Sequence, residues 1–192
     1  MDRHLFNEIK HIAHSMFQKN FFGVFHGSIS TRTSINSFSI NRKFTILDDV
    51  QESCFIHLNC LGKQDYRWNE ASVDVEIHKE IYKAFPNAKY ISYTMPPYAT
   101  AYSIAHDSLA PQDYYGKQML GEITIYDPQK FTTWEKRAPH EIINFFQKNN
   151  THLLLIKGFG LISYDRDLTE MVKKVAILEN SCKLLTLSSV ME

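Results

Sequence analysis

The sequence predicts a single α/β domain in which helices cover both faces of a central mixed, largely antiparallel sheet. Helix-like and strand-like segments interleave along the 192 residues, and prolines separate several of them. The first two strand-like segments have no helix between them, so we expect an antiparallel contribution to the sheet. A chain of this length buries one sizeable core. We therefore expect residues 1–192 to form one three-layer α/β/α domain.

The N-terminal half has the spacing of two helices and three strands. Apolar residues at Leu5, Ile9, Ile12 and Met16 predict a first helix, with Asp2 as its N-cap. The other elements predicted here are strands over residues 39–47 and 53–61 joined by a turn at 48–49, a helix over 72–85 stopped by a proline, and a strand over 88–95.

The C-terminal half continues this alternation. Its predicted elements are a helix opened by Pro96-Pro97 and ended before Pro111, a strand over 121–126, a helix opened by Ala138-Pro139, strands over 153–156 and 161–164 joined by a glycine turn, and a last helix capped by Asp167 and Glu170. Strands and helices thus interleave to the end of the chain.

Composition argues against several classes of partner. Lys plus Arg and Asp plus Glu both total 21, so the formal net charge is zero and no concentrated basic face is expected. Nucleic acid and anionic membrane are therefore not expected partners. The longest apolar runs fall far short of the ~20 residues that span a bilayer. The N-terminus has acidic residues instead of a secretory signal, so we expect a cytoplasmic protein.

Cysteine and histidine patterns do not predict a metal site. Cys54, His57 and Cys60 lie in a strand-like segment, where alternating side chains put the histidine on the face opposite to the cysteines. His11 and His14 lie three residues apart on the first predicted helix, but no acidic partner lies near them in the sequence. We interpret this pair as a solvated or packing pair.

Five short segments, taken in order, carry information about function. They are Gly27-Ser28-Ile29-Ser30-Thr31-Arg32, then Asp74 with His78, Ile81 and Tyr82, then Pro97-Tyr98-Ala99-Thr100-Ala101, then residues 153–160, which end in Gly158-Phe159-Gly160, and finally Ala176-Ile177-Leu178-Glu179. Together they resemble the class II aldolase and adducin family, which includes sugar-phosphate aldolases, epimerases and the non-enzymatic adducin head domains. The resemblance covers most of the chain and implies the family's α/β/α fold.

The resemblance implies an anion site near the first segment, which is similar to the family's Gly-Asn-x-Ser-x-Arg loop. A glycine-led turn with exposed amides and a nearby arginine suits a phosphate or carboxylate. We therefore expect Gly27, Ser28, Ser30, Arg32 and Ser72 to bind a small phosphorylated or anionic metabolite. A solvated surface charge is the alternative role for Arg32.

The same resemblance places the family's three zinc-binding histidines at Tyr93, Met95 and Phe159. Neutral tyrosine is a poor zinc ligand, the methionine thioether suits copper(I), and phenylalanine has no donor atom. We therefore expect no zinc, with these three residues lining or filling the former metal cavity. The family's acid/base glutamate falls on Asp74, which we interpret as the remnant of the catalytic position.

These departures predict an aldolase-like protein that has lost its metal-dependent catalysis and binds a ligand or a partner. The alternatives are an active lyase or epimerase with a relocated metal or a metal-independent mechanism, and a structural oligomer without a ligand. His106 and His152 are the histidines weighed for a relocated site, and both are expected to be remote. The resemblance also implies a homo-oligomer, a tetramer, with Tyr114, Tyr115 and Trp134 as aromatics available for an interface.

Overall fold

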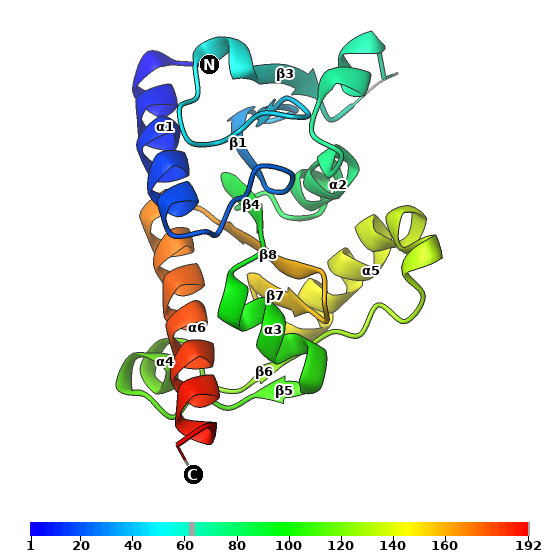
Figure 1. The fold of residues 1–192 in the computed structure, drawn as a ribbon. Coiled ribbons are helices and arrows are strands. Elements are labelled where there is room, and N and C mark those ends of the chain that lie inside the picture. Colours follow the sequence, from blue (N-terminus) through cyan, green and yellow to red (C-terminus); the bar gives the residue numbers. More distant parts are fainter. Residues whose placement is uncertain (62–63, 192) are drawn as a thin grey trace.

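The computed structural model describes residues 1–61 and 64–191 and confirms the three-layer α/β/α architecture (Figure 1). All neighbouring strands of its central sheet are antiparallel. From one edge to the other, the strands are β3 (Phe55–Asn59), β2 (Ser37–Asn41), β1 (Ser28–Ser34), β4 (Tyr90–Thr94), β8 (Gly160–Asp165) and β7 (Leu153–Ile156). The largely antiparallel character of the sheet expected from the sequence is therefore confirmed.

The other elements pack around this sheet. The helices are α1 (Arg3–Gln18), α2 (Val75–Ala84), α3 (Pro97–Ala105), α4 (Tyr114–Met119), α5 (Trp134–Asn149) and α6 (Leu168–Ser189). Two short strands, β5 (Ser108–Leu109) and β6 (Ile123–Thr124), pair with each other apart from the central sheet. Among the described residues, no helix is long and apolar enough to cross a membrane.

Each face of the sheet has its own hydrophobic core. Helices α1, α3 and α6 cover one face, and α2 and α5 cover the other (Figure 1). The alternation along β7 divides its side chains between them, with Leu153 and Leu155 in the first core and Leu154 and Ile156 in the second. Burying one such side chain contributes about 1.5–3 kcal/mol. Because helices cover both faces of the sheet, a strand made only of apolar residues can bury its side chains on both sides.

The prediction that residues 27–32 form a loop was wrong. Residues Ser28–Ser34 form β1, which lies between β2 and β4 in the sheet. Its composition conceals the strand because serine and threonine occupy buried positions that usually hold apolar residues. The hydroxyls of Ser28 and Ser30 are instead satisfied by hydrogen bonds to the buried His78.

Several element boundaries also differ from the sequence prediction. The strand predicted over 39–47 ends at Asn41, and a loop rather than a tight turn leads to β3. The third predicted helix ends at Ala105, before β5. Helix α5 begins at Trp134 and contains Pro139, so this proline is inside the helix and not at its start. Helix α4 was not predicted.

Helix α3 receives its N-terminal cap from a distant part of the chain. Its N-cap residue is Pro96, which has no side-chain acceptor. The carboxylate of Glu179, on α6, accepts hydrogen bonds from the backbone nitrogens of Tyr98 and Ala99 at 3.0 and 2.7 Å. Because negative charge is favourable at a helix N-terminus, this contact fixes α3 against α6.

We expect Glu179→Ala to lower the free energy of unfolding by about 2 kcal/mol, because two partly buried N–H groups of α3 lose a charged acceptor. Urea unfolding followed by circular dichroism measures this difference. Asn180→Ala, at an exposed position of the same helix, is the matched control and should change stability by no more than about 0.5 kcal/mol. Equal stability of the two variants would contradict the capping role.

Candidate functional site

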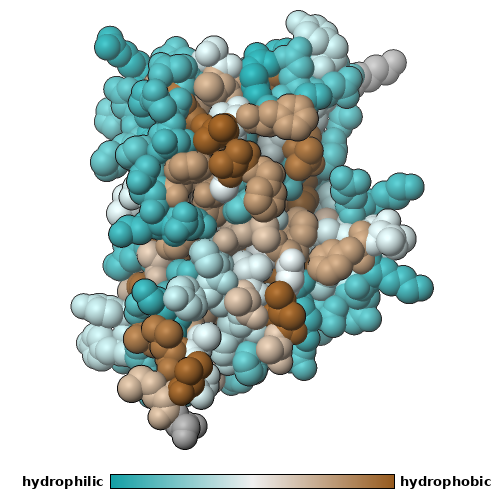
Figure 2. All heavy atoms as spheres, viewed as in Figure 1, coloured by the Kyte–Doolittle hydropathy of each residue, from teal (hydrophilic) through white to brown (hydrophobic). Residues whose placement is uncertain are grey.

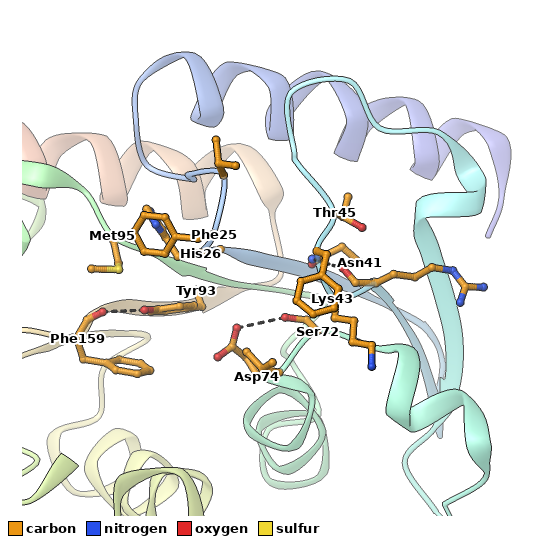
Figure 3. Close-up of a pocket in the computed structure, with 15 residues that line it drawn as sticks. Phe25, His26, Asn41, Lys43, Thr45, Ser72, Asp74, Tyr93, Met95 and Phe159 are labelled. Atoms are coloured by element: carbon orange, nitrogen blue, oxygen red, sulfur yellow. Dashed lines mark hydrogen bonds between the residues drawn. The ribbon is translucent and has the colours of Figure 1, made fainter. Parts of the chain in front are cut away.

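A cavity of about 320 Å³ opens beside the central strands, next to the start of α2 (Figure 3). Its lining comes from the segment before β1, the loop after β2, the start of α2, the end of β4 and the turn between β7 and β8. The lining residues are Val24, Phe25, His26, Gly27, Asn41, Arg42, Lys43, Phe44, Thr45, Ser72, Val73, Asp74, Tyr93, Met95 and Phe159. Segments far apart in the sequence therefore meet in one pocket.

The pocket brings together six of the nine site residues predicted from the sequence. These six are Gly27, Ser72, Asp74, Tyr93, Met95 and Phe159. The remaining three, Ser28, Ser30 and Arg32, belong to β1 and do not line the pocket.

The two serines take part in a buried hydrogen-bond network centred on His78. Ser28 Oγ lies 2.9 Å from His78 Nε2, and Ser30 Oγ lies 2.6 Å from His78 Nδ1. Ser30 Oγ also lies 2.8 Å from the Tyr82 hydroxyl. Burial lowers the pKa of His78 to about 3, so its imidazole is neutral. The network ties β1 to α2 beneath the pocket.

Arg32 is hydrogen-bonded at the far end of α2. Its guanidinium donates to the carbonyl oxygens of Tyr82, Phe85 and Ala88 at 2.6, 3.1 and 2.9 Å. It also lies over the Tyr82 ring, 4.8 Å from the centroid. Asp74 precedes the opposite end of the same ten-residue helix, a helix length of about 15 Å away. These contacts cap α2 and hold Arg32 apart from the pocket.

Asp74 is the ionisable group of the pocket wall. Its side chain is buried at the N-terminal end of α2, and Ser72 Oγ donates to its Oδ2 at 3.3 Å (Figure 3). Burial raises the pKa of Asp74 to about 6, although hydrogen bonds from Ser28 and Ser72 act in the opposite direction. A carboxyl group with this pKa exchanges its proton near neutral pH, so it can accept or donate a hydrogen bond there.

Tyr93 and Phe159 form the aromatic wall of the pocket. Their rings stack with centroids 4.8 Å apart and an interplanar angle of 26°, and the Tyr93 hydroxyl donates to the Phe159 carbonyl at 2.8 Å (Figure 3). Trp134 packs its ring against Phe159 at a steep angle. Burial raises the pKa of Tyr93, which keeps its hydroxyl protonated and engaged with the carbonyl.

The donor set at these positions does not fit zinc. The Tyr93 hydroxyl is protonated and bonded, Phe159 has no side-chain donor, and Met95 offers only a soft thioether. Across residues 1–61 and 64–191, no three or more His, Cys, Asp or Glu side chains are grouped to hold a metal. His106 and His152 do not line the pocket.

The pocket mouth contains residues that sequence reasoning missed. Phe25 and Phe44 are 87% and 90% exposed, and Val24 and Val73 beside them are also largely exposed. Phe44 has a φ of 62°, in the left-handed region that a bulky residue seldom adopts. No local pattern in the sequence signals this conformation, so the exposed rim could not be predicted.

Lys43 and His26 complete the polar part of the lining. Lys43 is exposed beside Phe44, whereas the neighbouring Arg42 is paired with Glu70 and donates to the Ser53 carbonyl. Both ring nitrogens of His26 are buried without a partner among the described residues, and burial lowers its pKa. The positive charge at the mouth therefore comes mainly from Lys43.

Three expectations outside the pocket are corrected. An acidic partner does lie near His14, because the loop after β2 brings the Asp48 carboxylate to 3.1 Å from its Nδ1. Trp134 is only 4% exposed and is not available for an interface, whereas Tyr114 and Tyr115 are exposed. His57 is exposed and Cys60 is buried, as predicted, but Cys54 lies in a 3-10 helix before β3 and packs against the first core, whereas Cys60 belongs to the second. The two cysteines therefore do not share a face, contrary to the predicted alternation.

Comparison with known proteins identifies the family. A profile of the Class II Aldolase and Adducin N-terminal domain matches residues 7–186. The chain belongs to this family. No curated protein sequence matches the chain significantly.

Solved structures from the same family share the fold. L-fuculose-1-phosphate aldolase from Thermus thermophilus is 20% identical, with a TM-score of 0.85 over 97% of this chain and 95% of that one. A sugar-phosphate aldolase from Thermotoga maritima is 15% identical, with a TM-score of 0.74 over 98% and 96%. L-fuculose 1-phosphate aldolase from Glaciozyma antarctica is 16% identical, with a TM-score of 0.72 over 96% and 73%. At these identities the likeness establishes the class II aldolase fold.

Replacing Asp74 with asparagine should change how stability depends on pH. The folded-state pKa of about 6 exceeds the ordinary value of 3.8, so wild-type stability falls as pH rises between these values. The difference corresponds to about 3 kcal/mol. Urea unfolding at pH values from about 4 to 7 should show this loss in the wild type and not in Asp74→Asn. The other titrating groups are the same in both proteins, so their contributions cancel in the difference between the two unfolding free energies. Parallel pH profiles of wild type and Asp74→Asn would contradict the raised pKa of Asp74.

Proposed function

We propose that this class II aldolase family member binds a small ligand in the pocket beside Asp74 and has lost metal-dependent lyase chemistry. The observation that carries the proposal is the Tyr93–Phe159 stack, which occupies two of the three positions where the resemblance places zinc-binding histidines. The cavity of about 320 Å³ that remains beside the stack supports a binding role.

The chemistry of aldol cleavage supports the proposed loss of metal-dependent catalysis. Breaking the carbon–carbon bond generates an enediolate, and a divalent cation stabilises such an anion by several kcal/mol. Each 1.36 kcal/mol of barrier corresponds to about tenfold in rate, so losing this stabilisation costs orders of magnitude. Asp74 can accept a proton, but Tyr93, Met95 and Phe159 supply no ligand set for a zinc ion that would hold the resulting anion.

One observation favours a second candidate, an active aldehyde-lyase or epimerase that works without the family metal. Asp74 is a buried carboxyl with a pKa of about 6, as suits a general base, and Lys43 lines the same cavity with a positive charge. L-fuculose 1-phosphate, named in the Thermus thermophilus relative, is the reference substrate for this alternative. Cleavage that persists with a chelator present and is lost in both Asp74→Asn and Lys43→Gln would favour it.

Restoring histidines tests whether the pocket has lost only its metal ligands. We expect the combined variant Tyr93→His, Met95→His, Phe159→His to retain about one zinc per chain after dialysis, because three imidazoles form a suitable zinc site. The wild type, purified without chelators or affinity-tag metals, should retain far less. Metal analysis by mass spectrometry measures both.

Controls separate metal binding from misfolding in this experiment. Circular dichroism should show the wild-type fold for the triple variant, and Phe159→His alone should not retain zinc, since one imidazole cannot hold the ion tightly. Near-stoichiometric zinc in the wild type would contradict the proposal. A folded triple variant without zinc would show that these three positions do not converge on one site.

A further inference from the structure

Aromatic side chains converge on the pocket from four separate parts of the chain. Tyr93 and Phe159 form the inner wall, with Phe25 beside them (Figure 3). Phe44 also lines the pocket and, like Phe25, is largely exposed at the mouth. In this view Phe159 lies on one side of the Tyr93 ring, and Phe25 lies on the other with His26. The described lining therefore presents aromatic surface both in the wall and at the entrance.

The exposure of the two mouth residues needs an explanation. Phe25 and Phe44 are 87% and 90% exposed and contribute little to either core. Figure 2 shows hydrophobic side chains gathered between α1 and α2, on the face where the pocket opens. Contiguous exposed apolar surface around a cavity is typical of a ligand-binding site. The mouth is therefore arranged to contact a molecule that enters it.

Seven of the fifteen lining residues are polar or charged, and two places among them suit the polar groups of a ligand. Asp74 and Ser72 are in the wall, where the carboxyl can accept a hydrogen bond from a hydroxyl or amino group. Lys43 is at the mouth and is exposed, so its ammonium can pair with an anionic group. Asn41 is less available, because its Oδ1 accepts from the Ile29 nitrogen at 2.8 Å.

We infer that the pocket binds small aromatic acids, each with one planar ring, a carboxylate for Lys43 and a hydroxyl or amino group for Asp74. The ring stacks or packs edge-on against the aromatic lining made by Phe25, Tyr93 and Phe159. A cavity of about 320 Å³ suits one ring with short substituents. This inference rests on the proposed ligand-binding function and names its ligand class.

The lining disfavours a sugar as the ligand. Each hydroxyl of a polyol needs a hydrogen-bond partner when it is buried, and an unpaired one costs about 1–3 kcal/mol. The aromatic wall offers few such partners, since the Tyr93 hydroxyl is already bonded to the Phe159 carbonyl. Ser30 and Arg32, which sequence reasoning assigned to an anion site, make internal hydrogen bonds outside the lining.

Isothermal titration calorimetry with matched probes tests the ligand class. 4-Hydroxybenzoate should bind at least about tenfold more tightly than 4-hydroxycyclohexanecarboxylate, which has the same polar groups without the aromatic ring. Inorganic phosphate should not compete with 4-hydroxybenzoate. Phe25→Leu should weaken 4-hydroxybenzoate by about threefold to tenfold, because one aromatic contact is lost at an exposed position.

Further variants assign the two polar contacts. Lys43→Gln should weaken 4-hydroxybenzoate and reduce the salt dependence of its binding, because the paired charge is removed. Asp74→Asn tests the inner contact and should weaken 4-hydroxybenzoate more than benzoate, which lacks the hydroxyl. Tyr114→Leu, an exposed aromatic on α4 outside the lining, is the matched control and should leave all affinities unchanged.

The outcomes separate this inference from the proposed function. Equal affinity for the aromatic and saturated acids would overturn the ligand class and leave the pocket as a ligand site. Failure of folded protein to bind either acid would also overturn it. Zinc-dependent cleavage of a sugar phosphate would instead overturn the proposed function, whatever the affinity for aromatic acids.

Discussion

The contact between Tyr93 and Phe159 determines the chemistry of this pocket. It joins β4 to the turn between β7 and β8 through a stacked ring pair and a hydrogen bond from the Tyr93 hydroxyl to the Phe159 carbonyl. Gly160 makes the close approach possible, because a Cβ at this residue would lie 2.4 Å from the Thr94 carbonyl oxygen. Where the family resemblance places metal ligands, the chain thus has a packed aromatic wall.

The remaining features of the pocket follow from this wall. Aromatic bulk excludes water from one side of Asp74, which is consistent with burial as the main cause of its raised pKa. With no suitable zinc donors, the pocket keeps Asp74 and Ser72 as a hydrogen-bonded pair in the same lining as the aromatic wall. The three-layer fold does not depend on this change, since its stability comes from the two cores on either side of the sheet. Family membership and altered site chemistry are therefore compatible.

The fold was largely predictable from the sequence, but the site was predictable only in part. The short apolar run Leu153–Ile156 identifies β7, because all four of its residues are buried and their apolar composition alone indicates this. Strand β1 was missed because its buried serines are satisfied by His78, which lies far away in the sequence. The anion-binding role predicted for Arg32 failed for a similar reason, because its guanidinium donates to backbone carbonyls on and just after α2, far away in the sequence. The exposure of Phe44 depends on one left-handed backbone conformation that no sequence pattern indicates.

The most direct test of the central claim is an aldol-cleavage assay of the wild-type protein on a sugar phosphate, with added zinc and with a chelator. We expect no cleavage above the background of Asp74→Asn in either condition, because the pocket has no suitable zinc ligands beside its carboxyl. Cleavage that saturates with zinc, disappears with the chelator and is lost in Asp74→Asn would contradict the proposed loss of zinc-dependent catalysis.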